Sequence, residues 1–286
     1  MKHHIRSSEN IAKALLRLLA RDLAAARREM AGGGPREERV HRARQRLKRC
    51  RTLLRVLEPA YGERAVALRR KLSEAARILA GARDADVAAA SARELSTTEG
   101  GEEAGFSRVA IALDAEAAAA HRERTPLRDV NERFREAMAE VATLTPDFDG
   151  HAILAAAMRM AYARGRKAML KAESTLSTPD LHRWRKAVKD LWHLIRLARK
   201  RLPKRVAKTA PSLDRLGETL GLGNDAALLA EKLALSPTGD PSLMRQLALI
   251  ARRRHALEAE AFALGSELYR RRGKSFARRI ELQHRK

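Results

Sequence analysis

The chain has 286 residues and a formal net charge of +24 at pH 7. This length suits two similar units of about 140 residues, each large enough for its own core. The charge exceeds what solubility requires and indicates a polyanionic partner, whether nucleic acid, polyphosphate or an anionic surface. Aromatic residues make up only 3% of the chain, and an apolar set dominated by Ala and Leu favours packed helices over a β core. We expect an all-α fold.

Arginines interrupt every long apolar stretch, which excludes a transmembrane span and a signal-peptide core. The only cysteine, Cys50, lies on the apolar face of its predicted helix, so we expect a buried and inert thiol. A single cysteine allows no disulfide within the chain, which fits a reducing compartment. The expected location is therefore cytoplasmic, without membrane association.

Glycine and proline breaks divide the first part of the chain into predicted helices. Three glycines before Pro35 end the first helix, and Pro59 with Gly62 ends the second. Asp84 before an apolar run is a good N-cap for a shorter helix. The predicted helices cover residues 9–30, 36–57, 63–80, a short segment from 84, 104–124 and 127–143.

The segment 145–150 is rich in turn-forming residues and is the predicted boundary between two halves, residues 1–146 and 147–286. The second half repeats the order of helices. Its predicted helices cover residues 151–173, 180–201, 205–221 and 225–235, and a long C-terminal helix follows the break at 236–241.

One basic motif occurs twice. The run HRARQRLKRCRTLLR starts at residue 41, and the run HRWRKAVKDLWHLIR starts at residue 182. Both runs carry His, Arg, Lys and Arg at relative positions 0, 3, 7 and 14, which on a helix of about 100° per residue share one narrow face. We call these faces the first stripe and the second stripe. The first stripe is His41, Arg44, Lys48 and Arg55, and the second is His182, Arg185, Lys189 and Arg196.

A helix face that is merely exposed to solvent would not need to carry positive charges only. Residues 41–57 nevertheless hold seven Lys and Arg and no Asp or Glu, although acids at i±4 would stabilise the helix. Each histidine also has a purely structural interpretation as a capping or core residue. Its occurrence in register with three cations makes ligand binding an equal alternative.

A second correspondence has the same spacing. Residues 79–84, LAGARD, align with residues 220–225, LGLGND, and are separated from them by the same number of positions as residue 41 from residue 182. We call this separation the repeat offset. Two motifs held at one offset indicate two copies of a helical unit, which would pair about a pseudo-two-fold axis. The two stripes could then line one central groove. Cations on the first helix of each half are weaker candidates for the same groove: Arg17, Arg21, Arg28, Arg159 and Arg166.

Enzymatic chemistry would need metal-holding acids or an activated nucleophile. The candidates are Asp84, Asp86 and Asp225, but the two duplicated ones lie where an N-cap or a turn hydrogen bond is expected. Gly221 and Gly223 suggest a helix C-cap and close packing. The sequence contains no HExxH, CxxC or P-loop motif. We therefore expect no catalytic residues, no bound metal and no cofactor.

The two HxxRxxxK segments, each followed within its own half by an L-[A/G]-x-x-[R/N]-D segment, resemble the CHAD family, named for its histidine-bearing α-helical domain. The resemblance covers nearly the whole chain as a single domain, 1–286. It implies two four-helix-bundle halves around a basic central cavity, binding of inorganic polyphosphate, and association with polyphosphate granules.

The ligand contacts implied by the resemblance are the two stripes together with Arg51. Its counterpart in the second copy is Trp192, so a charge is lost there, and His193 on the same face partly replaces it. Nucleic-acid binding is the main alternative function, although the few aromatic residues disfavour it and make nucleic acid the weaker competitor. A granule scaffold and an accessory protein to a phosphate-polymer enzyme are further alternatives.

Overall fold

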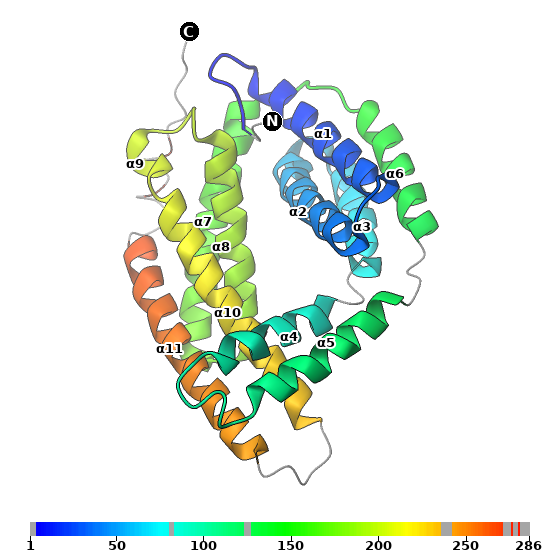
Figure 1. Ribbon diagram of the computed structural model, residues 1–286. Helices are drawn as coiled ribbons and strands as arrows, with labels where there is room; N and C mark the ends of the chain where they lie inside the picture. Colours follow the sequence, from blue (N-terminus) through cyan, green and yellow to red (C-terminus); the bar gives the residue numbers. More distant parts are fainter. Residues whose placement is uncertain are drawn as a thin grey trace.

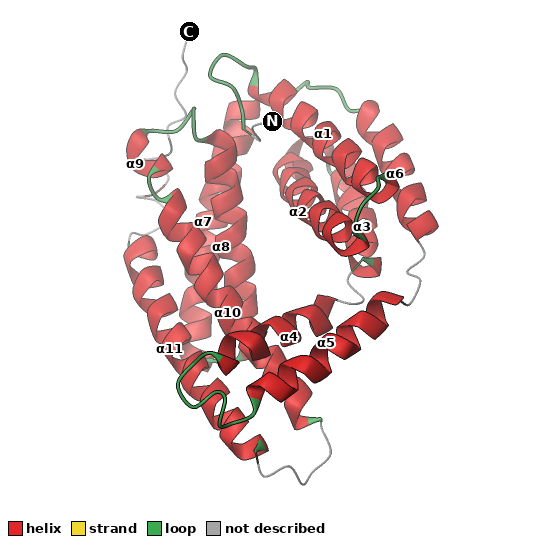
Figure 2. Ribbon diagram, in the orientation of Figure 1, coloured by secondary structure: helices red, strands yellow, loops and turns green. Residues whose placement is uncertain are grey.

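The computed structural model describes residues 4–79, 83–122, 127–235 and 242–270, together with Phe276 and Ile280. The described residues form helices and no strand (Figure 2), which confirms the all-α prediction. The helices, in chain order, are α1 (Ile11–Ala31), α2 (Arg36–Tyr61), α3 (Glu63–Ile78), α4 (Arg83–Ser96), α5 (Phe106–Arg122), α6 (Leu127–Ala142), α7 (Gly150–Thr175), α8 (Thr178–Ala198), α9 (Lys204–Ala207), α10 (Ala210–Ala234) and α11 (Leu243–Tyr269).

Polar side chains fix where several helices begin. Asn10 accepts a hydrogen bond from the Lys13 backbone N at 3.0 Å and caps α1. Asp149 accepts from the backbone N of His151 at 2.9 Å and caps α7. Ser177 accepts from the backbone N of Asp180 at 3.3 Å and caps α8. Each cap satisfies backbone donors that the first turn of a helix leaves open.

The helices form two four-membered groups and a separate hairpin (Figure 1). In the first group α1 packs on α2, α2 on α3, α3 on α6 and α6 on α1. In the second group α7 packs on α8, α8 on α10, α10 on α11 and α11 on α7. Helices α4 and α5 pack against each other, and α4 also contacts α10. The first half of the chain therefore reaches the second at two places, through this hairpin and through α1 and α2.

One continuous hydrophobic core runs through both four-helix groups. Trp184 is fully buried in it and stacks on Phe262 with ring centroids 5.1 Å apart, which confirms that Trp184 belongs to the core face of its helix. Cys50 is also fully buried, as predicted, and burial raises the pKa of its thiol. A second, smaller core lies between the α4–α5 hairpin, the C-terminal part of α10 and the N-terminal part of α11. It includes Phe106 and Leu229.

Helix α10 corrects one sequence prediction. It runs unbroken from Ala210 to Ala234, whereas a break between residues 221 and 225 was expected. Gly221 and Gly223 are therefore not C-caps, and Asp225 is not an N-cap, because all three lie inside the helix. The matching region of the first half does change helices, since α3 ends at Ile78 and α4 begins at Arg83. The side chain of Asp84 lies outside the described part of the chain.

Gly265 of α11 provides a test of this packing. A Cβ atom added there would lie 2.5 Å from Cζ2 of Trp184 and 2.8 Å from Sδ of Met169. We expect Gly265→Ala to lower the free energy of unfolding by about 1–3 kcal/mol, because overpacking outweighs the gain in helix propensity. Gly223→Ala is the matched control, since its added Cβ would meet nothing within 4 Å. Denaturant titration should show the control unchanged or stabilised; equal destabilisation of both variants would contradict the packing.

Candidate functional site

The two copies of the motif also form equivalent hydrogen bonds. Arg44 donates from Nη1 to the carbonyl of Ala76 at 3.1 Å, and Arg185 donates from Nε to the carbonyl of Gly217 at 3.3 Å. The two donors are separated by the repeat offset, and so are the two acceptors. Each stripe therefore lies along the contact between two neighbouring helices of its bundle. These are α2 and α3 for the first stripe, and α8 and α10 for the second.

Two glycines of α10 leave room for the second stripe. A Cβ atom at Gly217 would lie 2.6 Å from Cε of Lys189, and one at Gly221 would lie 3.0 Å from Nε of Arg185. The side chains of Arg185 and Lys189 therefore lie closely against α10. Nζ of Lys189 then reaches Oδ1 of Asp214 at 2.9 Å. The expected close packing at Gly221 is thus present, although the helix continues through it.

The two stripe histidines have different surroundings. His182 is half-buried, and its Nδ1 lies 2.9 Å from Oδ1 of Asn224. An amide oxygen only accepts, so the proton is on Nδ1 and Nε2 is left for another contact. Burial, followed by the charge of Lys186, lowers the pKa of His182. His41 is exposed, and its Nε2 lies 2.8 Å from the amide nitrogen of Gln45.

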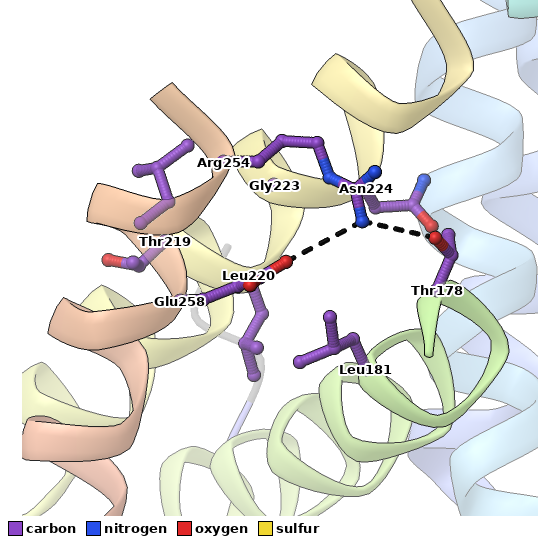
Figure 3. A pocket seen from close by; sticks show the side chains of 9 residues that line it. Thr178, Leu181, Thr219, Leu220, Gly223, Asn224, Arg254 and Glu258 are labelled. Atoms are coloured by element: carbon purple, nitrogen blue, oxygen red, sulfur yellow. Dashed lines mark hydrogen bonds and ion pairs between the residues drawn. The ribbon is translucent and has the colours of Figure 1, made fainter. Parts of the chain in front are cut away.

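A small pocket lined in part by Asn224 lies beside this hydrogen bond (Figure 3). Thr178 and Leu181 of α8 line it together with residues of α10 and α11. The guanidinium of Arg254 crosses it, donates to Oγ1 of Thr178 at 3.2 Å and lies 3.5 Å from the carboxylate of Glu258. An ion pair of the protein itself, Arg254 with Glu258, thus forms part of the pocket wall.

The two stripe helices meet each other directly, at a contact between α2 and α8 that we call the crossing. On one side of the crossing Arg55 forms an ion pair with Asp190. The single hydroxyl proton of Thr52 is shared between the carbonyl of Lys48 at 3.2 Å and the same carboxylate at 3.4 Å. Arg164 of α7 lies 3.9 Å from it. Asp190 is thus surrounded by donors from α2 and α7.

The other side of the crossing also gathers several arginines. The repeat offset relates Arg49 to Asp190 and Arg55 to Arg196, so Arg49 and Arg196 occupy the equivalent contact. Burial lowers the pKa of Arg49, and the charges of Arg46, Arg196 and Arg21 lower it further. The fully buried Asp22 of α1 opposes this, at 3.0 Å from Arg46 and 3.9 Å from Arg49.

Trp192 lies among the cations of the second stripe. Its ring centroid is 4.8 Å from Nζ of Lys189 and 4.5 Å from the guanidinium carbon of Arg196. His193 packs edge-on against the same ring at 4.6 Å. Trp192 therefore replaces the charge of Arg51 with a surface that positions two neighbouring cations. Arg51 itself is half-buried, and burial followed by the charge of Arg55 lowers its pKa.

The weaker candidates on α1 and α7 have different surroundings. Arg17 is held by Glu9 through two contacts of 2.5 and 2.7 Å, and Arg21 lies close enough to Arg49 to affect its pKa. Arg28 and Arg159 are exposed, and Arg166 is half-exposed. The structure therefore brings Arg21 to the crossing and leaves Arg17 in an ion pair of its own.

Sequence reasoning missed three residues that the structure places at the crossing: Arg49, Arg164 and Asp190. The signal for two of them was present, because Arg49 and Asp190 hold the same relative position in the two runs. They lie off the narrow stripe, and the contact between α2 and α8 brings Asp190 to Arg55 and places Arg49 within the influence of Arg196. Among the described residues there is no group of three or more His, Cys, Asp or Glu side chains that could hold a metal ion.

A family model described as the CHAD domain matches residues 11–234. The chain belongs to this family. The CHAD domain of the plant Ricinus communis, a crystal structure, is similar with a TM-score of 0.64 and 19% identity, covering 99% of this chain and 96% of that one. PptA from Streptomyces chartreusis is similar with a TM-score of 0.58 and 18% identity, covering 93% of this chain and 100% of that one.

At these identities the two structures support the CHAD fold alone. No curated protein matches the sequence significantly. Among the described helices of this CHAD domain, none is long and apolar enough to cross a membrane.

Proposed function

We propose that this CHAD domain binds inorganic polyphosphate, without catalysis, along the two stripes and the crossing that joins them. The observation that supports the proposal most is the crossing itself, where the two copies of one basic motif meet and cations outnumber carboxylates. On the side of Arg49 and Arg196, the buried Asp22 is the carboxylate that opposes several arginines. A chain of phosphates would supply the missing negative charge.

The arrangement suits a polymer of repeating charge. We infer two halves, residues 1–146 and 147–286, related by a pseudo-two-fold axis through the crossing, so that equivalent cations continue from one stripe into the other. Arginine offers paired donors to phosphate oxygens, and lysine offers a movable charge. Such a ladder needs no base recognition, and release of condensed counterions would supply much of the affinity.

The proposed contacts are those carried by the duplicated motif and its surroundings. They are His41, Arg44, Lys48, Arg51, Arg55, His182, Arg185, Lys189, His193 and Arg196, with Arg49 added by the structure. Arg21 is a further contact at the crossing.

Nucleic acid is the second candidate partner, favoured only by the overall charge. Binding of single strands relies on aromatic side chains on which bases stack. Trp184 is fully buried, and the ring of Trp192 already carries Lys189 and Arg196. Neither tryptophan therefore offers an open platform for a base.

Direct titration tests the proposal. Labelled long-chain polyphosphate should bind the purified CHAD domain in the presence of a chelator, because the cations rather than a metal make the contacts. The same sample should release no phosphate over hours. Absence of binding would reject the function, and steady hydrolysis would reject its non-catalytic character. Cytoplasmic polyphosphate granules are the proposed setting, either alone or with an enzyme of phosphate polymers.

The half-buried histidine makes the affinity depend on pH. Burial lowers the pKa of His182, so without ligand its contribution to stability falls as pH drops below the ordinary value of about 6.5. Bound phosphate stabilises the imidazolium and raises this pKa. We therefore expect affinity to increase up to about tenfold between pH 7.5 and 5.5 at constant ionic strength, since one unit of pKa corresponds to tenfold.

The histidine variant provides the control for this pH effect. His182→Gln keeps a polar side chain that does not titrate. It should weaken the pH dependence of polyphosphate affinity, leaving the share contributed by the other proposed histidine contacts, His41 and His193. An unchanged pH profile in His182→Gln would show that His182 does not contact the ligand.

A further inference from the structure

Asp190 is the acidic exception in the duplicated motif. The first half carries Arg49 at the equivalent position. Asp190 forms an ion pair with Arg55, accepts a hydrogen bond from Thr52 and lies 3.9 Å from Arg164. On one side of the crossing the second stripe helix itself therefore supplies a carboxylate. On the other side the charge of Arg196 acts on Arg49, and the carboxylate there, Asp22, comes from α1.

The charges around Asp190 show what this carboxylate does. Burial lowers the pKa of Arg51 and of Arg164, and in both cases the charge of Arg55 lowers it further while Asp190 raises it. The side chain of Asp190 is only 21% exposed. Asp190 is the carboxylate that acts on both Arg51 and Arg164, whereas Glu58 acts on Arg164 and pairs with Arg69 at 3.0 Å. Asp190 thus occupies the position that an anionic ligand would take among these guanidinium groups.

A carboxylate and a phosphate bind a guanidinium in the same way. Both offer two oxygens to its paired donors, so they compete for one face of the side chain. Nη1 of Arg55 is engaged by Asp190, so a bound phosphate must displace this carboxylate or use the remaining donors of Arg55. The second stripe has no such restriction at Arg196, the counterpart of Arg55, whose guanidinium lies over the ring of Trp192.

We propose that Asp190 is a built-in competitor of the polyanion, which holds Arg55 and Arg164 and confines the strongest ligand contacts to the Arg49 and Arg196 side of the crossing. This inference rests on the proposed function. The ligand then binds more strongly on one side of the crossing than on the other, although the motif is duplicated. Asp190 thereby lowers the affinity for the ligand without touching it.

Neutralising Asp190 tests the competition directly. Asp190→Asn keeps the shape and the acceptor oxygen but removes the charge. At about 150 mM salt it should bind labelled long-chain polyphosphate about tenfold more tightly than wild type, with a steeper salt dependence, because it adds about one charge-assisted contact. The control with an equal change in charge is Asp114→Asn. Asp114 lies on α5 and forms an ion pair with Arg93 of α4. The control should change affinity by less than about twofold, as expected for diffuse electrostatics alone.

A second pair of variants keeps the inference testable if Asp190→Asn fails to fold. Arg55→Gln and Arg196→Gln remove the same charge from equivalent positions. We expect Arg196→Gln to lose at least about fivefold more affinity for polyphosphate, since Arg55 is already engaged. Equal losses in the two variants, or unchanged or weaker binding by Asp190→Asn, would overturn the inference while wild-type binding upholds the proposed function. Failure of the wild-type protein to bind would overturn both.

Discussion

A variant with Gln at four stripe positions should lose polyphosphate affinity by at least about a hundredfold, because several charge-assisted contacts of about 1.5–3 kcal/mol each are removed together. The replaced residues are Arg44, Lys48, Arg185 and Lys189. Gln has nearly the helix propensity of Arg and Lys, and at position 185 its amide nitrogen can take the place of the Nε that donates to the carbonyl of Gly217. Circular dichroism should therefore show an unchanged helical content, so that the loss reflects binding rather than unfolding.

The matched control replaces the same number of Arg and Lys on other helices. Its four positions are exposed and lie on α7, α9 and α11: Lys171, Lys204, Arg245 and Arg252. Net charge falls by four in both variants, so long-range attraction weakens equally. If the stripes hold the ligand, the control should lose less than about fivefold, as expected for attraction without oriented contacts. Similar losses in the two variants would mean that binding is diffuse and that the stripe residues form no site.

Salt should weaken the complex steeply. If roughly six to ten phosphates are contacted, affinity should fall by about three orders of magnitude or more between about 50 and 200 mM salt, because each neutralised phosphate releases condensed counterions. The logarithm of the binding constant should be linear in the logarithm of salt concentration, and the slope gives the number of contacts. Isothermal or fluorescence titrations at four salt concentrations are sufficient. A nearly flat dependence would contradict a ladder of cations as the source of affinity.

The repeat in the sequence predicted much of this architecture. Trp184 and Cys50 lie in the core as their helical positions indicated, and the hydrogen bonds of Arg44 and Arg185 are related by the offset found in the sequence. The physical reason is that periodic apolar residues determine which helix face is buried. Once that face is known, the position of the stripe beside it follows.

Local helix breaks were harder to predict. Two glycines, an Asn and an Asp at residues 221–225 are typical of a turn, yet α10 continues through them. The side chains of Arg185 and Lys189 lie where Cβ atoms at residues 221 and 217 would otherwise be. The glycines therefore serve contact between helices rather than termination, and this tertiary effect cannot be seen in local propensity.

The surroundings of the charged residues also depend on contacts between distant helices. Asp190 belongs to the second basic run, but its neighbours Arg55 and Arg164 come from α2 and α7. Asp22 similarly lies on α1 and pairs with Arg46 of α2. Spacing along one helix gives the direction of each side chain, whereas the charge that it meets is set by how the bundles dock. The asymmetry of the crossing is consequently a finding of the structure.

Competition between polyanions is the most direct test of the central claim that this CHAD domain recognises polyphosphate. Labelled long-chain polyphosphate is bound first, and unlabelled polyphosphate, duplex DNA or RNA is then added at equal phosphate concentration and at near-physiological salt. We expect unlabelled polyphosphate to displace the label at least about tenfold more effectively than either nucleic acid, because closely spaced, freely rotating phosphates match the ladder of stripe cations and no base platform is available. Displacement by DNA or RNA at equal or lower phosphate concentration would contradict this claim and identify the protein as a nucleic-acid-binding one.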